Sequence, residues 1–241
     1  MGGKIKGSYG IDAPYVPVLM LVVAVVCGVF AVFKVWSTPS IVWIVIGLAF
    51  VVQAAIYLNT TLRGKFKIWR TIISDLGLKG DERALDVGCG RGMVLITTAG
   101  SLPNGTSVGI ELWRSRDQSG NDPEVTKANA ALNDVGDRVE IKTEDMTELS
   151  FPDASFDVVT ANVAIQNVKD RQLRKHTIDE ILRVTKPGGR IRIVDMQYVN
   201  QYRDDLVAAG ATDVKVKYLG LNGVFGNMFA ISRLVSASKP V

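Results

Sequence analysis

The stretch of sequence with the clearest chemical potential is LDVGCGRGMV, at residues 85–94. Asp86 lies in the apolar run, which is followed by three glycines at alternate positions, Gly88, Gly90 and Gly92. Glycines permit a sharp turn and let a ligand reach the main chain, and the start of a following helix offers unpaired N–H groups to an anion. The third glycine comes one residue too early for the G-x-G-x-x-G turn that binds dinucleotides. The spacing therefore favours a ligand with a carboxylate near the helix and an ammonium near Asp86 over a pyrophosphate.

Acidic residues also follow the next two predicted strands. Glu111 ends the second strand, where a carboxylate can accept hydrogen bonds from both hydroxyls of a ribose. Asp145 follows the third strand and could accept from the amino group of an adenine, with Leu112 and Met146 placed to sandwich the base. Asp86 and Glu111 could each instead cap a neighbouring helix. Three acidic strand ends in succession nevertheless indicate a ligand that contains an adenosine.

The chain from residue 79 onward alternates strand-like and helix-like segments. The predicted strands are 84–87, 107–111, 139–143, 156–161, 190–194, 214–219 and 229–235, and the predicted helices are 92–101, 121–133, 171–185 and 201–210. Such alternation indicates an α/β fold with a parallel sheet covered by helices on both faces. Ligands of these sheets bind at the carboxyl ends of the strands, which is where the acidic residues fall.

Four segments in this region resemble the motifs of a known family. They are LDVGCGRG at 85–92, VGIE at 108–111, EDMTELSFPDASFDVV at 144–159 and LRVTKPGGRIRIVD at 182–195. Their order and spacing are similar to those of the class I S-adenosylmethionine-dependent methyltransferases, in particular the small-molecule branch related to the ubiquinone and menaquinone biosynthesis enzymes. The resemblance covers about residues 62–238. It implies a Rossmann-like, mostly parallel sheet of seven strands, of which the last is antiparallel.

The resemblance also implies an enzyme that uses S-adenosyl-L-methionine as methyl donor. The cofactor-binding residues that we predict on this basis are Asp86, Gly88, Cys89, Gly90, Glu111, Leu112, Asp145, Met146 and Asn162. Methyl transfer from a sulfonium is an in-line displacement, so most of the catalysis can come from positioning the acceptor. A base is needed only if the acceptor must lose a proton.

The segment NVAIQN, at residues 162–167, borders the transferred methyl group in this family. Many relatives that this chain resembles have a histidine where Gln166 stands, and a glutamine can hydrogen-bond an acceptor but cannot abstract a proton near neutral pH. The predicted catalytic residues are Gln166 and Asp195, although Asp195 could equally cap the following helix. Asp117 and Tyr198 are further candidates.

Few residues of the chain are suited to metal or nucleophile chemistry. The two cysteines, Cys27 and Cys89, lie in unlike surroundings, and His176 is the single histidine. We therefore predict no metal site, no disulfide framework and no serine–histidine–aspartate triad. His176 falls in the middle of a predicted helix, where we expect it to be exposed.

The loop WRSRDQSGN, at residues 113–121, is long for a connection between a strand and a helix. It holds two arginines beside a tryptophan. It could fold over the cofactor, meet acidic groups of the acceptor, or stand as a solvated Ω-loop.

Residues 1–60 lie outside the resemblance and contain two uncharged runs, 16–33 and 41–58. Each has 18 residues, which span about 27 Å as a helix, close to the hydrocarbon thickness of a bilayer. We predict two transmembrane helices joined as an antiparallel hairpin. A cleaved signal peptide is the alternative for the first run.

Charge sets the expected orientation of this hairpin. The turn between the runs holds only Lys34, whereas the flanking segments hold Lys4, Lys6, Arg63, Lys65, Lys67 and Arg70. The positive-inside rule then places both termini and the catalytic domain in the cytoplasm. Ala24 and Gly28, four residues apart, could let the two helices approach closely.

Residues 61–78 are predicted to form an amphipathic helix that connects the anchor to the domain at 79–241. The apolar residues recur at helical spacing and are Phe66, Trp69, Ile72, Ile73 and Leu76. The helix could lie on the membrane surface, pack on the core of the domain, or do both.

The charge balance bears on the partners. Residues 1–78 hold seven basic and two acidic residues, whereas residues 79–241 hold 21 basic and 22 acidic ones. The larger domain therefore has no net basic field to attract nucleic acid, which we do not expect as a partner. The hairpin favours an acceptor that partitions into the bilayer. We predict a membrane-anchored methyltransferase acting on a small, lipophilic acceptor beside membrane lipid; the alternative is a membrane-bound S-adenosylmethionine-binding module or scaffold without turnover.

Overall fold

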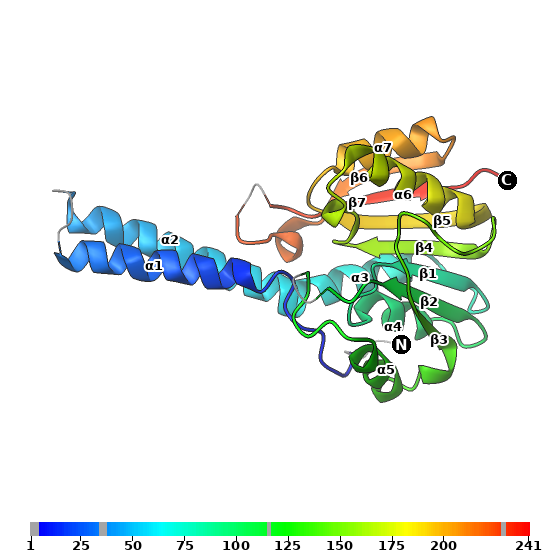
Figure 1. Ribbon diagram of the computed structural model, residues 1–241, viewed down its shortest axis with the longest axis horizontal. Coiled ribbons are helices and arrows are strands. Elements are labelled where there is room, and N and C mark those ends of the chain that lie inside the picture. The colour runs from blue at the N-terminus through cyan, green and yellow to red at the C-terminus, as the bar shows by residue number, and fades with distance from the viewer. Residues whose placement is uncertain (1–4, 34–37, 115–116, 228–229) are drawn as a thin grey trace.

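The computed structural model describes residues 5–33, 38–114, 117–227 and 230–241. It consists of an α/β domain from which a hairpin of two long helices projects (Figure 1). The expectations for Lys4, for Lys34 and for most of the turn that joins the two apolar runs lie outside the described residues.

The domain is built on a sheet in the order β3-β2-β1-β4-β5-β7-β6. β1 to β5 run parallel, and β7 lies antiparallel between β5 and β6, as predicted. The strands are β1 Arg83–Val87, β2 Thr106–Glu111, β3 Val139–Thr143, β4 Phe156–Asn162, β5 Thr185–Asp195, β6 Thr212–Tyr218 and β7 Arg233–Ser238. The predicted Rossmann-like α/β fold with seven strands is therefore confirmed.

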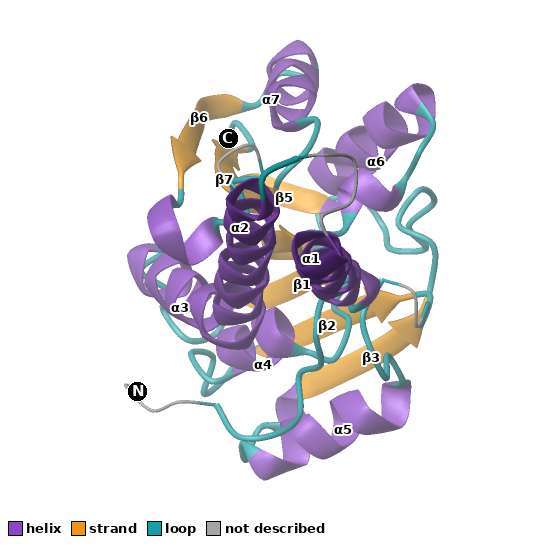
Figure 2. Ribbon diagram, turned by 90° about the vertical axis from the view of Figure 1, so that its left-hand side faces the viewer, coloured by secondary structure: helices purple, strands orange, loops and turns teal. Residues whose placement is uncertain are grey.

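The helices of the domain cover both faces of the sheet. They are α3 Lys65–Asp75, α4 Met93–Ala99, α5 Pro123–Leu132, α6 Arg171–Val184 and α7 Val199–Ala208. α3, α4 and α5 pack on one face, and α6 and α7 on the other (Figure 2). The predicted ends of α4 to α7 are each within two residues of those observed. His176 on α6 is exposed, as expected.

Two strands differ from their predicted bounds. β5 begins at Thr185, five residues early, because Thr185 pairs with Phe156 before a register shift in β4. β7 begins at Arg233, so the described residues 230–232, which were predicted to be in the strand, are not part of it; residue 229, where the prediction began, lies outside the described residues. The start of β5 was predicted too late because glycine and proline usually mark a turn, and the start of β7 was predicted too early because residues 229–235 are largely apolar.

The connecting segment is helical and packs on the domain. Trp69 is fully buried, and Ile72, Ile73 and Leu76 join the same apolar cluster as Val94 of α4. Burying such side chains stabilises the domain by roughly 1.5–3 kcal/mol each. Packing on the core is therefore one role of this helix.

The two apolar runs form helices α1 Tyr15–Phe33 and α2 Ser40–Asn59, which lie side by side (Figure 1). Gly47 of α2 allows their close approach, because a Cβ there would lie 3.3 Å from both the Ala24 carbonyl oxygen and Cys27 Cβ. Gly28 has no atom within 4 Å of its Cβ position, so the expectation that it serves the contact is wrong. Ala24 does lie at the contact.

Helix α2 continues without a break into α3 through a π-helical turn, η2 Thr60–Gly64. A Cβ on Gly64 would collide with the carbonyl oxygen of Asn222, which lies in a short turn after β6. The bare backbone thus lets the domain approach the helix closely where the π turn occurs.

The segment before α1 runs back along the domain, which the sequence did not predict. The Lys6 N–H donates to Asn133 Oδ1 (2.8 Å) and the Ser8 N–H to Asn129 Oδ1 (2.9 Å), both near α5. Asp12 then forms a largely buried ion pair with Lys65 of α3 at 2.9 Å. The chain before the hairpin is therefore bound to the domain at several points.

Candidate active site

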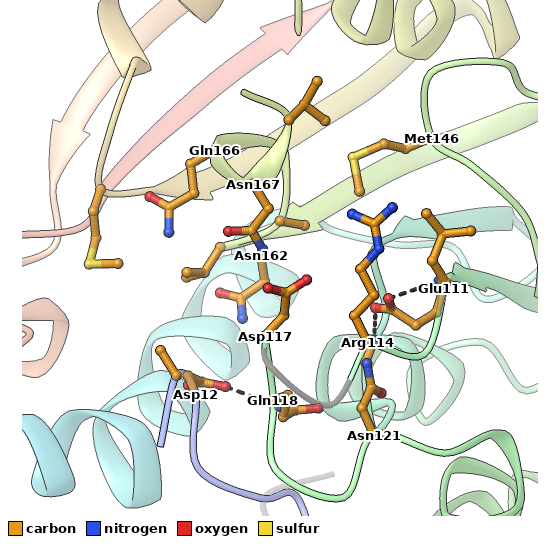
Figure 3. A pocket seen from close by; sticks show the side chains of 18 of the residues that line it. Asp12, Glu111, Arg114, Asp117, Gln118, Asn121, Met146, Asn162, Gln166 and Asn167 are labelled. Atoms are coloured by element: carbon orange, nitrogen blue, oxygen red, sulfur yellow. Dashed lines mark hydrogen bonds between the residues drawn. The ribbon is translucent and has the colours of Figure 1, made fainter. Parts of the chain in front are cut away.

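A cavity of about 840 Å³ lies at the carboxyl ends of the parallel strands (Figure 3). Its walls come from the glycine-rich turn, from the loops after β2, β3, β4 and β5, and from the base of the hairpin. Ten of the eleven predicted site residues line it: Asp86, Gly88, Cys89, Gly90, Glu111, Leu112, Asp145, Met146, Asn162 and Gln166. The topology of the sheet thus brings together residues that are 80 positions apart.

The glycine-rich turn is shaped by protein contacts as well as by any ligand. Gly88 has φ +72°, and a Cβ there would collide with Ala164 Cβ. Gly90 has φ +51°, and its Cβ would lie 2.6 Å from Gln118 Oε1. L-residues rarely adopt these φ values, so glycine is required at both positions.

The N–H groups of this turn already have acceptors. Those of Gly88 and Cys89 donate to the carbonyl oxygen of Ile110, each at 3.0 Å. The Gly90 N–H donates to Glu111 Oε2 (2.9 Å) and the Arg91 N–H to Gln118 Oε1 (2.8 Å). These four N–H groups precede α4, at whose start the sequence predicted unpaired donors, and all four are paired, although the two side-chain acceptors can be exchanged for a ligand oxygen.

Asp86 is fully buried and caps the first turn of α4. Its carboxylate accepts from Thr160 Oγ1 (2.8 Å) and from the Leu95 N–H (3.0 Å). Burial raises its pKa to about 7. The capping role considered from the sequence is thus present, and a cation beside the carboxylate would offset the cost of burying its charge.

Glu111 closes the turn from the end of β2. It accepts from the N–H groups of Gly90 and Leu112, both at 2.9 Å, and of Trp113 at 3.3 Å. A carboxylate offers about four acceptor positions, so one position is open, and a ligand donor can take a second by displacing the long bond from Trp113. It lies at the cavity wall next to Leu112.

The ends of β3 and β4 supply further polar groups. Asp145 Oδ1 accepts from the N–H and the hydroxyl of Thr147 at 2.9 and 2.8 Å, and within the described chain Oδ2 accepts no hydrogen bond. Asn162 Oδ1 accepts from Trp69 Nε1 at 2.7 Å. The indole of α3 therefore orients the Asn162 amide, a contact that the helical spacing of Trp69 did not reveal.

Gln166 and Asp195 are placed differently. Gln166 lines the cavity, and its Oε1 accepts weakly from the Gln197 N–H at 3.3 Å. Asp195 is fully buried, does not line the cavity, and accepts from the N–H groups of Gln166 (3.0 Å) and Met196 (2.9 Å) and from the Tyr202 hydroxyl (3.3 Å). Burial raises its pKa to about 7. This geometry does not support direct contact of Asp195 with substrate, and it makes Asp195 a positioning residue for Gln166.

The loop after β2 folds over the glycine-rich turn. Gln118 bridges the Arg91 N–H to Asp12, whose Oδ1 accepts from Gln118 Nε2 at 3.0 Å. Asp117 lines the cavity, its side chain is directed inward (Figure 3), and among the described residues its carboxylate accepts no hydrogen bond. The solvated-loop alternative is thus wrong for this part; residues 115–116 lie outside the described chain.

Tyr198 lies away from the cavity. Its ring stacks beneath the Arg174 guanidinium, whose Cζ is 3.7 Å from the ring centroid. The structure therefore does not bring this candidate to the site.

Several cavity residues were missed from the sequence. Asn121 is buried, and its Oδ1 has no hydrogen-bond partner within the described chain. Others come from the hairpin and its flanks, namely Asp12, Tyr15, Val16, Met20, Tyr57 and Lys65, and from the loop after β6, namely Phe225 and Ala230. The one local signal was the isolated acid Asp12 before an uncharged run, and its partner Lys65 is 53 residues away.

The central part of the chain is similar in sequence to known proteins. Residues 85–193 match the family model described as a methyltransferase domain. The 27-O-demethylrifamycin SV methyltransferase of Amycolatopsis mediterranei is 38% identical over 125 residues, which are 52% of this chain and 42% of that protein. The ubiquinone/menaquinone biosynthesis C-methyltransferase UbiE of Geotalea daltonii is 32% identical over 142 residues, 58% of this chain and 57% of that protein. The chain thus spans about half the length of the curated relatives it matches.

Solved structures share the fold. The YcgJ protein of Bacillus subtilis aligns with a TM-score of 0.56 at 15% identity, over 73% of this chain and 99% of that one. A SAM-dependent methyltransferase of Aquifex aeolicus aligns with a TM-score of 0.51 at 19% identity, over 70% and 88%. Together with the matched family model, these likenesses lead to one conclusion: residues 85–193 are similar to a methyltransferase domain, and the chain has the fold of the solved structures.

Proposed function

We propose that this chain is a membrane-anchored enzyme that transfers a methyl group from S-adenosylmethionine to a small, lipophilic acceptor of the quinol or phenol type. The observation that carries the proposal is the cavity, which joins the acidic strand ends to the base of the apolar hairpin. Relatives named for demethylmenaquinone methylation and for ubiquinone/menaquinone biosynthesis support this acceptor class.

The cavity residues fit the cofactor chemically. Glu111 has room to accept from ribose hydroxyls, and Asp145 Oδ2 can accept from an adenine amino group. The unpartnered Asn121 Oδ1 needs a donor, because leaving a buried polar atom unsatisfied costs about 1–3 kcal/mol. An ammonium near Asp86 would favour the charged form of a carboxyl whose pKa burial has raised to about 7.

Membrane anchoring is supported by the surface of the hairpin. Both helices are long and apolar enough to cross a membrane, and in each only 17% of the most apolar window is buried. A core helix of a water-soluble protein would be mostly buried. Retention of the first helix, rather than its cleavage as a signal peptide, is supported by Asp12, which holds the segment before it to the domain through Lys65. The orientation stays a prediction from charge.

The proposed chemistry needs little beyond positioning and one proton acceptor. Held by these cavity residues, S-adenosylmethionine would supply an electrophilic methyl group on a sulfur that can leave as a thioether. Gln166 and the Asn162 amide hydrogen-bond the acceptor and aim its reacting atom. Asp117, directed into the cavity, takes the proton that a hydroxyl or ring carbon releases.

Methyl transfer by full-length protein in membranes tests the proposal. Membranes from cells that overproduce the chain should transfer label from S-adenosylmethionine to a quinol or phenol in a lipid extract, and membranes with the Glu111→Ala variant should not. Mass spectrometry of the products identifies the methylated atom. Cofactor binding without transfer to any lipid extract would overturn the proposal in favour of a binding module or scaffold.

The role of Asp117 can be separated from that of Gln166. Asp117→Asn is expected to lower kcat/KM by about 10²–10⁴-fold, because it removes the proposed general base. Gln166→Ala is expected to lower the rate without changing the shape of its pH profile. Asp137→Asn, in an exposed turn, is the control of the same chemistry and should leave kcat/KM unchanged. Equal pH profiles for wild type and Asp117→Asn would show that Asp117 is not the base.

Gly88→Ala is expected to destabilise the domain. An alanine at φ +72° costs about 1–2 kcal/mol, and its Cβ would also collide with Ala164. Gly77→Ala is the matched control, because Gly77 has φ +57° but no atom within 4 Å of its Cβ position. The free energy of unfolding should fall by about 2 kcal/mol more for Gly88→Ala than for Gly77→Ala. Equal losses would show that Ala164 can give way.

The buried carboxyl of Asp195 should make stability depend on pH. Its pKa in the folded protein is raised from 3.8 to about 7, so its contribution is fully present below about pH 4 and is lost as the pH rises through 7. Between pH 5 and pH 8 the wild type should lose about 3 kcal/mol of unfolding free energy more than Asp195→Asn. Asp86 titrates in the same way in both proteins, so its contribution cancels in the difference between their unfolding free energies. Parallel pH curves for the two would contradict the assignment.

A further inference from the structure

The cavity has a second, apolar end at the base of the hairpin. Val16 and Met20 of α1, Tyr57 of α2, and Phe225 and Ala230 of the loop after β6 line this end, which we call the vestibule. No cofactor role falls to these residues, and they lie outside the matched domain at 85–193. The same continuous cavity includes Gln166 and Asp117 at its polar end.

The walls of the vestibule are held in place by specific contacts. The Tyr57 and Phe225 rings meet edge to face with centroids 5.3 Å apart. The Thr60 hydroxyl donates to the Val224 carbonyl oxygen, and the Tyr57 hydroxyl donates to the Asp12 carbonyl oxygen at 2.7 Å. Val224 and Phe225, in the loop after β6, are therefore in direct contact with the base of the hairpin.

Gly226 brings this loop against α1. It has φ +89°, and a Cβ there would lie 2.7 Å from Met20 Cε. The positive φ favours glycine at this position, and a larger residue would also push the end of the Met20 side chain aside, so the loop approaches the hairpin here through bare backbone.

The vestibule meets the part of α1 that would lie at the membrane boundary. Met20 is the sixth residue of α1, so it lies about 8 Å along a helix whose whole length is close to the hydrocarbon thickness. Val18 and Leu19, on the outer side of the same turns, are 60% and 62% exposed. The apolar lining of the cavity is thus adjacent to an apolar surface that a bilayer would cover.

We propose that the vestibule is the entrance and chain-binding site for an amphiphilic acceptor that arrives from within the bilayer. Its polar head would reach Gln166 and Asp117, and its apolar chain would stay between α1 and the loop after β6. This inference rests on the proposed function, to which it adds the route and the class of ligand: a polar aromatic head on a long apolar chain. Burial of the chain contributes about 0.8 kcal/mol per CH₂, so affinity depends on chain length.

A photoreactive probe tests the vestibule without requiring turnover. The full-length protein is placed in vesicles of zwitterionic and anionic phospholipid with a long-chain alkylphenol that carries a diazirine midway along its chain. On illumination, adducts mapped by mass spectrometry should concentrate at Val16, Met20 and Phe225. Val16→Trp, which fills the vestibule, should reduce these adducts at least fivefold. Val18→Trp, on the exposed side of the same helix, is the matched control and should leave them unchanged.

The outcomes separate this inference from the proposed function. Adducts spread evenly over the exposed faces of α1 and α2, and equal in both variants, would overturn the vestibule even if methyl transfer occurs. Concentrated adducts that Val16→Trp abolishes would support it even if no acceptor is methylated, a result that would count against the proposed enzyme instead. Calorimetry with S-adenosylhomocysteine should show equal affinity for both variants and so verifies that they are folded.

Discussion

Replacing Asp12 by alanine is expected to lower the free energy of unfolding by about 3–5 kcal/mol, because the change leaves the Lys65 ammonium buried without its partner. Lys65 is 5% exposed and donates to both carboxylate oxygens of Asp12 at 2.9 Å. Asp12 also accepts from Thr61 Oγ1 (2.7 Å) and Gln118 Nε2 (3.0 Å). For a chain of this size the loss corresponds to a fall of about 10 °C in the unfolding temperature.

A double variant tests whether the buried charge causes the loss. Asp12→Ala with Lys65→Met removes both partners and should recover much of the stability. Lys127→Met, which breaks an exposed pair with Glu124, should change the unfolding temperature little. A double variant as unstable as Asp12→Ala alone would assign the effect to Thr61 and Gln118 rather than to Lys65.

Replacing Glu111 by alanine is expected to lower the affinity for S-adenosylmethionine by about 10²–10⁴-fold, because two hydrogen bonds to a charged acceptor contribute about 1.5–3 kcal/mol each. The change also frees the Gly90 N–H, which Glu111 accepts at 2.9 Å, and so loosens the glycine-rich turn. Calorimetric titration with the cofactor measures the loss directly.

Two further variants sharpen this result. Glu111→Gln keeps one acceptor oxygen and the shape of the side chain, so its affinity should lie between those of wild type and Glu111→Ala. Glu140→Ala, on β3 and half-exposed beside Lys142, should leave binding unchanged. A loss of affinity of less than about fivefold for Glu111→Ala would show that Glu111 does not bind the ribose, because even one charge-assisted hydrogen bond contributes more than that.

The fold and the cavity residues that follow β1 to β4 were predicted well from the sequence, because both depend on local patterns. Strand and helix alternation placed the carboxyl ends of β1 to β4 at one edge, and the residues that follow these strands do line one cavity. The motif order predicted the antiparallel β7 through resemblance, not through any pattern in β7 itself. Asp195 illustrates the limit of such reasoning. It ends β5 and was predicted to be catalytic, but its side chain is buried in the protein and does not line the cavity.

The parts that the sequence did not predict depend on contacts between distant segments. Asp12 lies 53 residues from Lys65 and 106 from Gln118, and no periodicity links them. The loop after β6 carries no motif, yet Phe225 and Gly226 build one wall of the vestibule. The glycines of the turn looked like a ligand site, whereas Gly88 and Gly90 also make room for Ala164 and Gln118.

The unbroken helix from Ser40 to Asp75 has a mechanical consequence. Its 36 residues form a rod of about 54 Å that begins in the proposed anchor and ends against the sheet. With Trp69 fixed in the core, the domain cannot swivel independently of this rod. In the proposed topology, lipids that shorten the hydrocarbon layer and tilt the rod must tilt the domain by the same angle. Bilayer thickness would thus set the angle at which the vestibule faces a substrate dissolved in the lipid.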